Sequence, residues 1–357
     1  MNRLPAEQKA LVEHYISDNN DRGDFERCIA HVEKLHDVLH YYQDLLRDDK
    51  HGKRYGEVNN LDSTALEKHV KSIRDSNYKF SALIVETIHG YVKHSLIDSK
   101  LQGFVKWFTS ILNGTNEVDL FTLNYDLLLE TILLQIGKGK EFMDFIIKLG
   151  HGLQQLLGNN PRYYFNPGNR KVMKKAEDCN TRLYHLHGSL SSFKDLNKES
   201  MGKGKGTYFK ISTEAIQENR FFDKIFDLNI VPSIIAGDRK DDKIQEMPFR
   251  FYYEEFMKKM SMEDQLCDKL FIIGYSFRDD HINRMISERL KLSTQIINPR
   301  PLEFLTIVDF ATSAEDKAKF IKRINFVLGL EQGAIGRFIE NDSRILFGGA
   351  NSIQVNV

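Results

Sequence analysis

The sequence predicts an α/β fold in which a parallel, Rossmann-like sheet is flanked by helices and the N-terminal third is mostly helical. Two observations predict it. Through the first 115 residues, apolar side chains recur at three- and four-residue spacing, as they do on one face of a helix. From residue 118 onward, short apolar runs of strand length alternate with helix-like segments. Near-continuous apolar strands that alternate with helices are typical of a parallel sheet buried on both faces.

Composition excludes several classes of protein. The chain of 357 residues is long enough for one large domain or two ordinary ones, and its 50 basic and 50 acidic residues cancel. A neutral chain gives no support to general nucleic-acid or membrane-surface binding. Three cysteines without a C-x-x-C pair exclude a four-thiolate zinc site. No stretch has the apolar character of a signal peptide or membrane span, so we expect a cytoplasmic protein.

The N-terminal part, residues 1–115, is expected to form a helical layer. One helix is indicated by the apolar series Phe25, Cys28, Ile29, Val32, Leu35, Leu39, Tyr42 and Leu45, and a second by Leu66, Val70, Ile73, Phe80, Ile84, Ile88, Val92 and Leu96. Gly23 and the polar segment 47–60 are the expected breaks. Amphipathicity leaves two roles open for these helices: packing on their own sheet, or forming contacts between subunits.

Residues 116–357 are expected to form the sheet domain, with loop insertions at about 138–228. The expected strands are 118–124, 182–188, 229–237, 268–276 and 302–310. The expected helices are 125–137, 248–260, 279–292 and 313–324. Within the insertions, three segments are interpreted as loops: 137–140, 159–169 and 201–206.

Polar clusters stand at the carboxyl ends of three expected strands. They are Asn124-Tyr125-Asp126, His185 to Ser189, and Gly274-Tyr275-Ser276 followed by Asp279, Asp280, His281 and Asn283. Each has an ordinary explanation, because Asn and Asp cap helices and a His-Gly pair forms a turn. In open α/β sheets, however, the carboxyl ends of the strands share one edge, where ligands bind. Three clusters in that position predict a common crevice.

Taken together, these segments resemble a known family. TLNYDLLLE (122–130), YHLHGSL (184–190) and FIIGYSFRDDHINRMI (271–286) are similar, in order and spacing, to blocks of the sirtuin-like domains of bacterial antiphage defence proteins. The resemblance covers about residues 116–310. It implies an NAD+ glycohydrolase that depletes the cellular NAD+ pool in abortive infection. Classical sirtuins are protein deacylases with a zinc module of paired cysteines, which this chain lacks, so deacylation is disfavoured.

The resemblance also implies residue roles. Asn124 is expected to orient water or a ribose hydroxyl, and His187 to take a proton from the ribose or the attacking water. Asp126 is expected to hold the strand end or the ribose, and Asp280 or Asn283 to shape the pocket wall. The expected cofactor-binding residues are Thr122, Asp126, Gly188, Ser189, Gly274, Tyr275, Ser276, Asp280 and Asn283. NAD+ is the expected substrate, and no metal ligands are assigned.

One family feature is missing. Sirtuin-like domains open with a strand and a Gly-Ala-Gly-x-Ser loop that cradles the pyrophosphate, and nothing in residues 1–117 matches it. Three explanations stand: an omitted upstream segment, which we favour; phosphate contacts from another subunit; or a degenerate relative acting as a scaffold or an NAD- or ADP-ribose-binding subunit. Because uncontrolled NAD+ hydrolysis would kill the host, the resemblance implies a homo-oligomer or a partner, such as a ring ATPase, a translocase or a nucleic-acid sensor.

Overall fold

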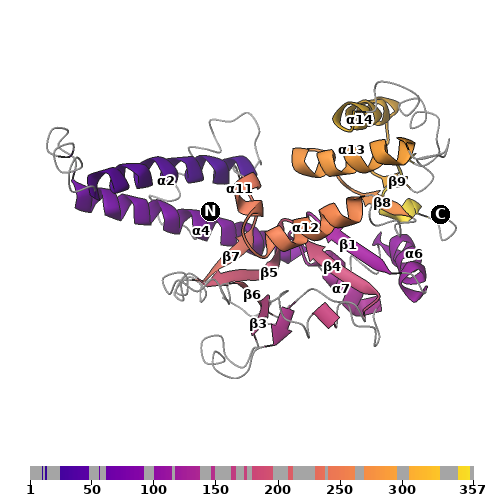
Figure 1. The fold of residues 1–357 in the computed structure, drawn as a ribbon, viewed down its shortest axis with the longest axis horizontal. Helices are drawn as coiled ribbons and strands as arrows, with labels where there is room; N and C mark the ends of the chain where they lie inside the picture. The colour runs from indigo at the N-terminus through magenta and orange to yellow at the C-terminus, as the bar shows by residue number, and fades with distance from the viewer. Residues whose placement is uncertain are drawn as a thin grey trace.

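The fold was analysed in a computed structural model. It describes residues 10, 13, 25–47, 56, 62–91, 100–114, 117–136, 146–148, 162–165, 173–174, 179–195, 208–211, 230–237, 240–261, 269–295, 305–329 and 345–353. Figure 1 shows two long N-terminal helices that reach away from a body of strands and shorter helices. No helix in these ranges combines the length and apolar character needed to cross a membrane.

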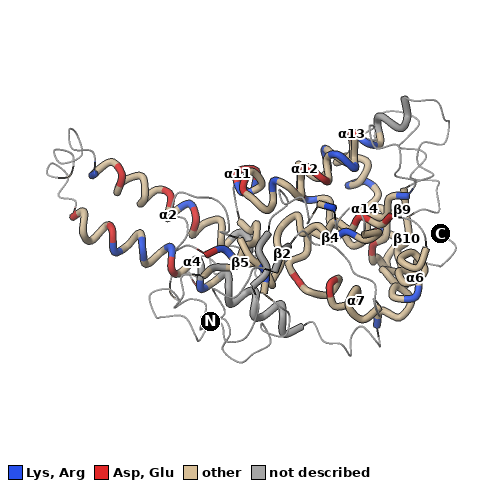
Figure 2. The backbone as a smooth tube through the Cα atoms, turned by 60° about the horizontal axis from the view of Figure 1, so that its bottom comes forward, with Lys and Arg blue, Asp and Glu red and all other residues tan. Residues whose placement is uncertain are grey.

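The two expected N-terminal helices are confirmed as α2 (Phe25–Arg47) and α4 (Ser63–Tyr91), which lie side by side. Their charged residues, of both signs, are distributed along the pair (Figure 2). The prediction of the buried face of α2 is wrong at the distal end of the helix, where Tyr42 is 37% exposed and Gln43 is buried instead. The expected breaks at Gly23 and between the helices fall almost wholly outside the described residues, as do residues 92–96.

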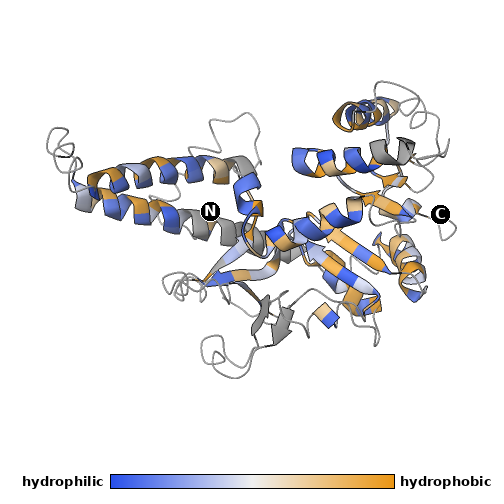
Figure 3. Cartoon of the chain, in the orientation of Figure 1, coloured by the Kyte–Doolittle hydropathy of each residue, from blue (hydrophilic) through white to orange (hydrophobic). Residues whose placement is uncertain are grey.

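Among the described residues, the parallel part of the fold contains five strands. They are β1 (Val118–Thr122), β4 (Thr181–His185), β8 (Leu270–Ile273), β9 (Leu305–Val308) and β10 (Ile345–Leu346). Strand β1 pairs with β4, and β9 lies between β8 and β10, all in parallel. The predicted parallel α/β fold is therefore confirmed. Strands β1 and β8 are coloured mostly at the hydrophobic end of the scale in Figure 3.

Alternate side chains of the parallel strands enter two different cores, as the pleat of a strand requires. One core receives Phe121, Tyr184, Ile272 and Ile307, and the other receives Leu120, Leu183, Phe271 and Val308. Both cores draw on strands from each of the two hydrogen-bonded groups. The parallel strands therefore form one layer that is buried on both faces.

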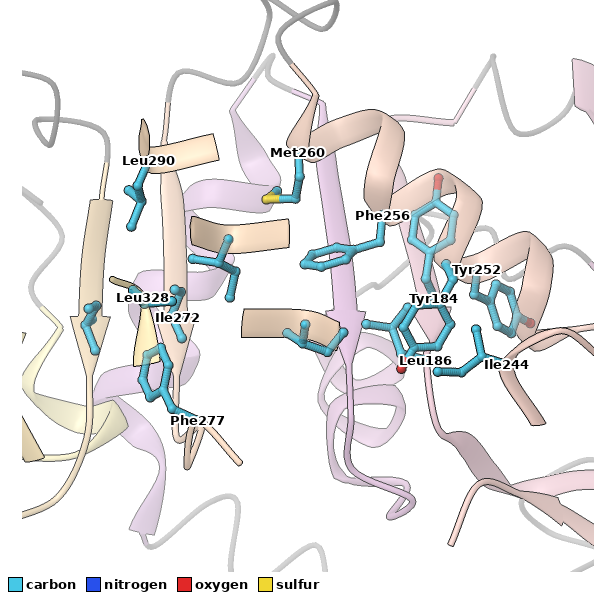
Figure 4. Packing of buried hydrophobic residues seen from close by; sticks show 14 of the residues in the cluster. Tyr184, Leu186, Ile244, Tyr252, Phe256, Met260, Ile272, Phe277, Leu290 and Leu328 are labelled. Atoms are coloured by element: carbon cyan, nitrogen blue, oxygen red, sulfur yellow. The ribbon is translucent and has the colours of Figure 1, made fainter. Parts of the chain in front are cut away.

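Helices cover both faces of this layer. The first core, shown in Figure 4, is closed by α12 (Phe249–Met260), α13 (Asp280–Gln295) and α14 (Ala314–Val327). The second is closed by α6 (Gln102–Asn113) and α7 (Leu128–Ile136), together with Ile353 after the short helix η2 (Ala350–Ser352). All four helices expected after residue 116 are present. The helix expected from residue 125 begins at Leu128 because Asp126 lies outside it as a cap.

The parallel layer is divided between β1 and β8, because no backbone ladder joins these two strands. The amide of Val118 bonds to Asn180 beside β4, and the amide of Gly274 bonds to Val308 of β9. Because backbone groups alternate along a strand, those of Asp119 and Phe121 in β1 point away from β4. By the same rule, Phe271 and Ile273 turn their backbone groups away from β9. The two edges are held in one layer by side-chain packing.

A second, antiparallel sheet was not expected from the sequence. Its order is β2 (Ile146–Lys148), β3 (Arg162–Phe165), β6 (Tyr208–Ile211), β5 (Gly188–Asp195) and β7 (Ile230–Ile234). Two expectations are corrected by it. The apolar run at 229–237 was expected in the parallel sheet, but β7 pairs antiparallel with β5. The segment 159–169 was interpreted as a loop, but it contains β3. A short apolar run does not encode the direction of its partner strand.

The helix pair joins the body beside β7, which contacts α4, and α2 lies next to the short helix α11 (Lys240–Ile244). A Cβ atom on Gly237 would lie 2.8 Å from an oxygen of Glu33 and 2.9 Å from a methyl carbon of Ile29. Gly237 also has φ +80, which favours glycine. Lys243 of α11 bonds both Glu33 and the carbonyl of Ala236. These contacts fix the inner end of α2 to the sheet.

Candidate functional site

The site begins at the carboxyl end of β4, where the turn Leu186-His187 leads into β5. Both residues are buried, and the carbonyl of His187 accepts a hydrogen bond of 2.8 Å from the amide of Ile235. The amide of Leu186 also bonds to the carbonyl of Thr122 in β1 at 2.9 Å, so backbone contacts on both sides position the imidazole. Its Nε2 atom is buried and has no hydrogen-bond partner among the described residues. Burial lowers the pKa of His187 to about 4, so the ring is neutral at pH 7.

Asp279 in the loop between β8 and α13 faces this imidazole, and Lys240 and His281 approach it from α11 and α13. Oδ1 of Asp279 lies 3.9 Å from Nε2 of His187 and 3.0 Å from Nζ of Lys240 in α11. The ring of His281 lies 6.1 Å from that of His187, and its Nε2 pairs with the hydroxyl of Tyr253 in α12 at 2.7 Å. Burial lowers the pKa of His281 as well, against the opposing effect of Asp279. Two of the three predicted clusters therefore meet at His187.

The end of β1 reaches the same place through Tyr125. The Tyr125 ring stacks on His187 with centroids 6.3 Å apart, and its hydroxyl donates to the carbonyl of Ile235 at 2.7 Å. The last residue pair of the β1–β4 ladder is Thr122 with His185. Asn124 and His187 each stand two residues beyond that pair, so both leave the sheet at the same level. Asn124 is exposed.

Two residues at the end of β1 have clear local roles. The hydroxyl of Thr122 accepts a hydrogen bond of 3.1 Å from the amide of Asn124, which holds the turn. The carboxylate of Asp126 accepts a hydrogen bond of 2.9 Å from the amide of Leu128 and so caps α7. Burial raises the pKa of Asp126, against the effect of this bond. For Asp126, the capping explanation therefore accounts for the contacts that the structure shows.

The two glycines expected to bind the cofactor differ in their surroundings. Gly188 has φ +91, and a Cβ there would lie 2.2 Å from the carbonyl oxygen of Ser233, so this glycine allows β5 and β7 to approach. Gly274 has φ +64, and a Cβ there would meet nothing within 4 Å. The open space beside the Gly274 backbone leaves room for a ligand.

The remaining expected residues fall into two groups. Tyr275 donates to Asn283 Oδ1 at 2.9 Å, and Asn283 donates to the carbonyl of Phe277 at 3.2 Å, so these residues brace the β8–α13 loop. Ser276 is exposed on that loop, and Asp280 is exposed at the first position of α13. Ser189 is fully buried and pairs with the hydroxyl of Ser191 at 2.9 Å. A ligand would therefore reach Ser189 only after that pair opens.

A second polar cluster lies deeper, behind His185. The Nε2 atom of His185 lies 3.2 Å from Oε1 of Glu130 in α7, and Lys210 of β6 also binds this carboxylate. Burial would raise the pKa of Glu130, but Lys210 and His185 together lower it to about 2. The cluster therefore holds a buried charge that joins the parallel layer to the antiparallel sheet.

The comparison with protein families identifies this architecture. The family model for the SIR2-like domain matches residues 118–328, which is more than half of the chain. The chain belongs to the SIR2-like family. No curated protein sequence matches it.

The matched SIR2-like region contains every residue described at the site, including two that sequence reasoning missed. Lys240 lies in a polar helix, and Tyr253 lies in the helix expected at 248–260, to which no site role was assigned. No motif marked either residue. Their role depends on how α11 and α12 pack over the carboxyl end of β4, which a single sequence does not reveal.

The candidate site therefore contains a neutral, buried imidazole, and an exposed amide and the open space beside the Gly274 backbone lie at strand ends of the same layer. A neutral imidazole can accept a proton, and an amide can orient water or a hydroxyl. The family's use of NAD+ fits this set, because nucleotide cofactors bind at the carboxyl ends of parallel strands.

Proposed function

We propose that the chain is an NAD+ glycohydrolase, which cleaves NAD+ to nicotinamide and ADP-ribose. The observation that carries this proposal is the imidazole of His187. It is buried and neutral, and its Nε2 atom has no hydrogen-bond partner among the described residues. A neutral buried base at a strand end suits proton transfer at pH 7.

The proposed reaction balances with water as the only co-reactant. The bond between the ribose anomeric carbon and the nicotinamide nitrogen breaks, and nicotinamide leaves with the bonding electron pair. Positive charge develops on the ribose, as in sugar hydrolysis. Water attacks the anomeric carbon, Asn124 orients it, and Nε2 of His187 accepts its proton and later passes it to solvent.

One further observation supports NAD+ as the substrate. The space beside Gly274 allows a ribose or phosphate to approach the backbone, and the exposed Ser276 and Asp280 follow it in the same loop and at the start of α13. Deacylation is disfavoured, because the three cysteines of the chain do not form the pairs of a deacylase zinc module.

The test is to incubate the purified full chain, with any partner encoded beside it, with NAD+ and to measure free nicotinamide. Asn124→Ala and His187→Gln are each expected to lower the rate by about 10²- to 10⁴-fold. Asn124 is exposed, so its variant should fold normally. His40→Ala, on the distal part of α2, is the control. Absence of nicotinamide release by the full assembly would instead favour a non-catalytic scaffold.

We further propose that this activity serves antiphage defence and is held off until a partner or an oligomer forms. A ring ATPase, a translocase or a nucleic-acid sensor is the proposed kind of partner. In bacteria that carry the gene, phage infection should lower the NAD+ pool in the wild type but not in the His187→Gln strain. Equal plaque numbers and equal NAD+ levels in both strains would overturn this part of the proposal.

A further inference from the structure

We propose that His187, Asp279 and His281 bind a divalent transition-metal ion of the zinc type, and that the bound ion blocks the site. One potential ligand atom from each of these residues lies within 4.8 Å of the other two. A tetrahedral ion with bonds of about 2.0–2.2 Å holds its ligand atoms about 3.4 Å apart. Side-chain movements of about 1 Å or less would therefore close the three groups around an ion.

The second observation is the state of the His187 side chain. Its Nε2 atom is buried without a hydrogen-bond partner among the described residues, and it faces Asp279 at 3.9 Å. An unsatisfied polar atom in a protein interior costs free energy, about 1–3 kcal/mol. A metal ion placed between the imidazole and the carboxylate would satisfy this atom.

The ligand set selects the kind of ion. Two imidazoles and one carboxylate suit zinc and neighbouring transition metals, whereas magnesium and calcium require oxygen ligands. The hydroxyl of Tyr253 bonds Nε2 of His281 at 2.7 Å, which fixes the orientation of that ring. Because Nε2 is bonded to Tyr253, Nδ1 of His281 is the proposed ligand atom, and a hydrogen bond to the other ring nitrogen of a metal-bound histidine commonly strengthens binding.

The ammonium of Lys240 competes with the proposed ion for Asp279, and this competition provides a test that is specific to the site. Its ammonium lies 3.0 Å from Oδ1 of Asp279, so the ammonium and an ion compete for the same oxygen. The Lys240 side chain is 24% exposed, so it has a route to solvent when an ion enters. Removing the Lys240 charge should therefore tighten metal binding, whereas an ion held elsewhere on the surface would be unaffected.

The effect on catalysis rests on the proposed function. An ion bound to Nε2 of His187 occupies the lone pair that would accept the proton. Zinc should therefore inhibit nicotinamide release, magnesium should not, and a chelator should restore the activity. The binding measurement itself requires no turnover.

The experiment is calorimetric titration of the chelator-treated full chain with Zn²⁺, supported by the visible absorption of the Co²⁺ form. One site per chain is expected. His281→Ala and Asp279→Asn should each weaken binding about 100-fold, Tyr253→Phe about 10-fold, and Lys240→Met should tighten binding about 10-fold. Circular dichroism and thermal unfolding check that each variant is folded.

The control addresses the most obvious adventitious site. On α2, the rings of His36 and His40 lie 5.8 Å apart, and His40 Nδ1 lies 3.1 Å from Asp44. His40→Ala should leave the affinity for Zn²⁺ unchanged. Loss of binding in this variant, or binding that is unchanged in both His281→Ala and Lys240→Met, would overturn the inference.

The two proposals can fail separately. A chain that hydrolyses NAD+ but does not bind zinc contradicts only the metal site. A chain that binds zinc through these three residues but releases no nicotinamide contradicts only the proposed reaction.

Discussion

His187 and Asp279 face each other across the carboxyl ends of β4 and β8, with Nε2 and Oδ1 3.9 Å apart. Lys240 contacts the same carboxylate oxygen from α11. The carboxylate raises the pKa of His187, and burial and the ammonium lower it, with burial dominating. Because these effects oppose one another, a change in the charge or burial of the site should change the pKa of His187.

The pH dependence of nicotinamide release should reflect this burial. Because the pKa of His187 is lowered from 6.5 to about 4, its neutral form persists in mildly acidic solution. We expect kcat/KM, measured with a chelator present, to stay high through pH 6 and to fall only as the pH approaches 4. In Asp279→Asn the fall should move to still lower pH. An acid limb centred at pH 6.5 would contradict the buried, neutral assignment.

Protein stability should follow the same group. The unfolded state binds the His187 proton more tightly than the folded state does, so this residue's contribution is fully present above about pH 6.5. It is lost as the pH falls towards 4. Chemical denaturation between pH 4 and 7 measures how far the free energy of unfolding falls as the pH is lowered. This fall should be smaller in His187→Gln than in the wild type.

Two glycine substitutions should separate a ligand contact from a packing contact. Gly274→Ala places a methyl group in open space at φ +64, so we expect a stability loss of only about 1–2 kcal/mol from backbone strain. Nicotinamide release should nevertheless fall, mainly through a higher KM. Gly188→Ala meets the Ser233 carbonyl at 2.2 Å and should cost about 3 kcal/mol or more. Urea denaturation and steady-state kinetics check both variants, and equal stability losses would contradict the distinction.

The buried Glu130 cluster should be sensitive to the loss of one partner. Lys210→Met leaves the Glu130 carboxylate buried beside His185 alone, and we expect a loss of about 3–5 kcal/mol at pH 7. The double variant with Glu130→Gln should recover part of this loss. Because the pKa of Glu130 is lowered to about 2, its contribution is present above about pH 4.5 and is lost as the pH falls towards 2. Acid unfolding curves of the three proteins provide the measurement.

The divided layer predicts a pattern of hydrogen exchange. The amides of Phe121 and Phe271 point towards the edges between β1 and β8, whereas those of Leu120 and Ile272 point to paired neighbours. We expect the first two to exchange at least about tenfold faster than the second two. Uniform protection along both strands would show that another segment pairs with these edges.

The sequence predicted three strands of the parallel layer because each is mostly apolar and is followed by a periodic helix. Those signals are local, so β1, β8 and β9 and the helices after them were predicted. The antiparallel sheet was not predicted, because its strands β2, β3 and β6 are only three or four residues long and loop-like segments adjoin them. Pairing between distant short strands is a tertiary property that composition does not reveal.

The convergence at the site was predicted in part. Polar residues at strand ends placed His187 near Asp279 and His281, because strand ends of a parallel layer share an edge. The contributions of Lys240 and Tyr253 could not be predicted, since they depend on the packing of helices over that edge. The burial of Ser189 also escaped, because a turn residue and a buried strand residue look alike in one sequence.

The attachment of α2 has a consequence for control of the proposed activity. Gly237, against which Ile29 packs, is two residues from Ile235, whose amide and carbonyl bind the backbone of His187 and the hydroxyl of Tyr125. The inner end of the long helix pair therefore contacts the backbone segment that positions the imidazole of His187. Binding of another protein to the distal half of α2 and α4 would thus be able to shift His187 without any contact with the candidate site.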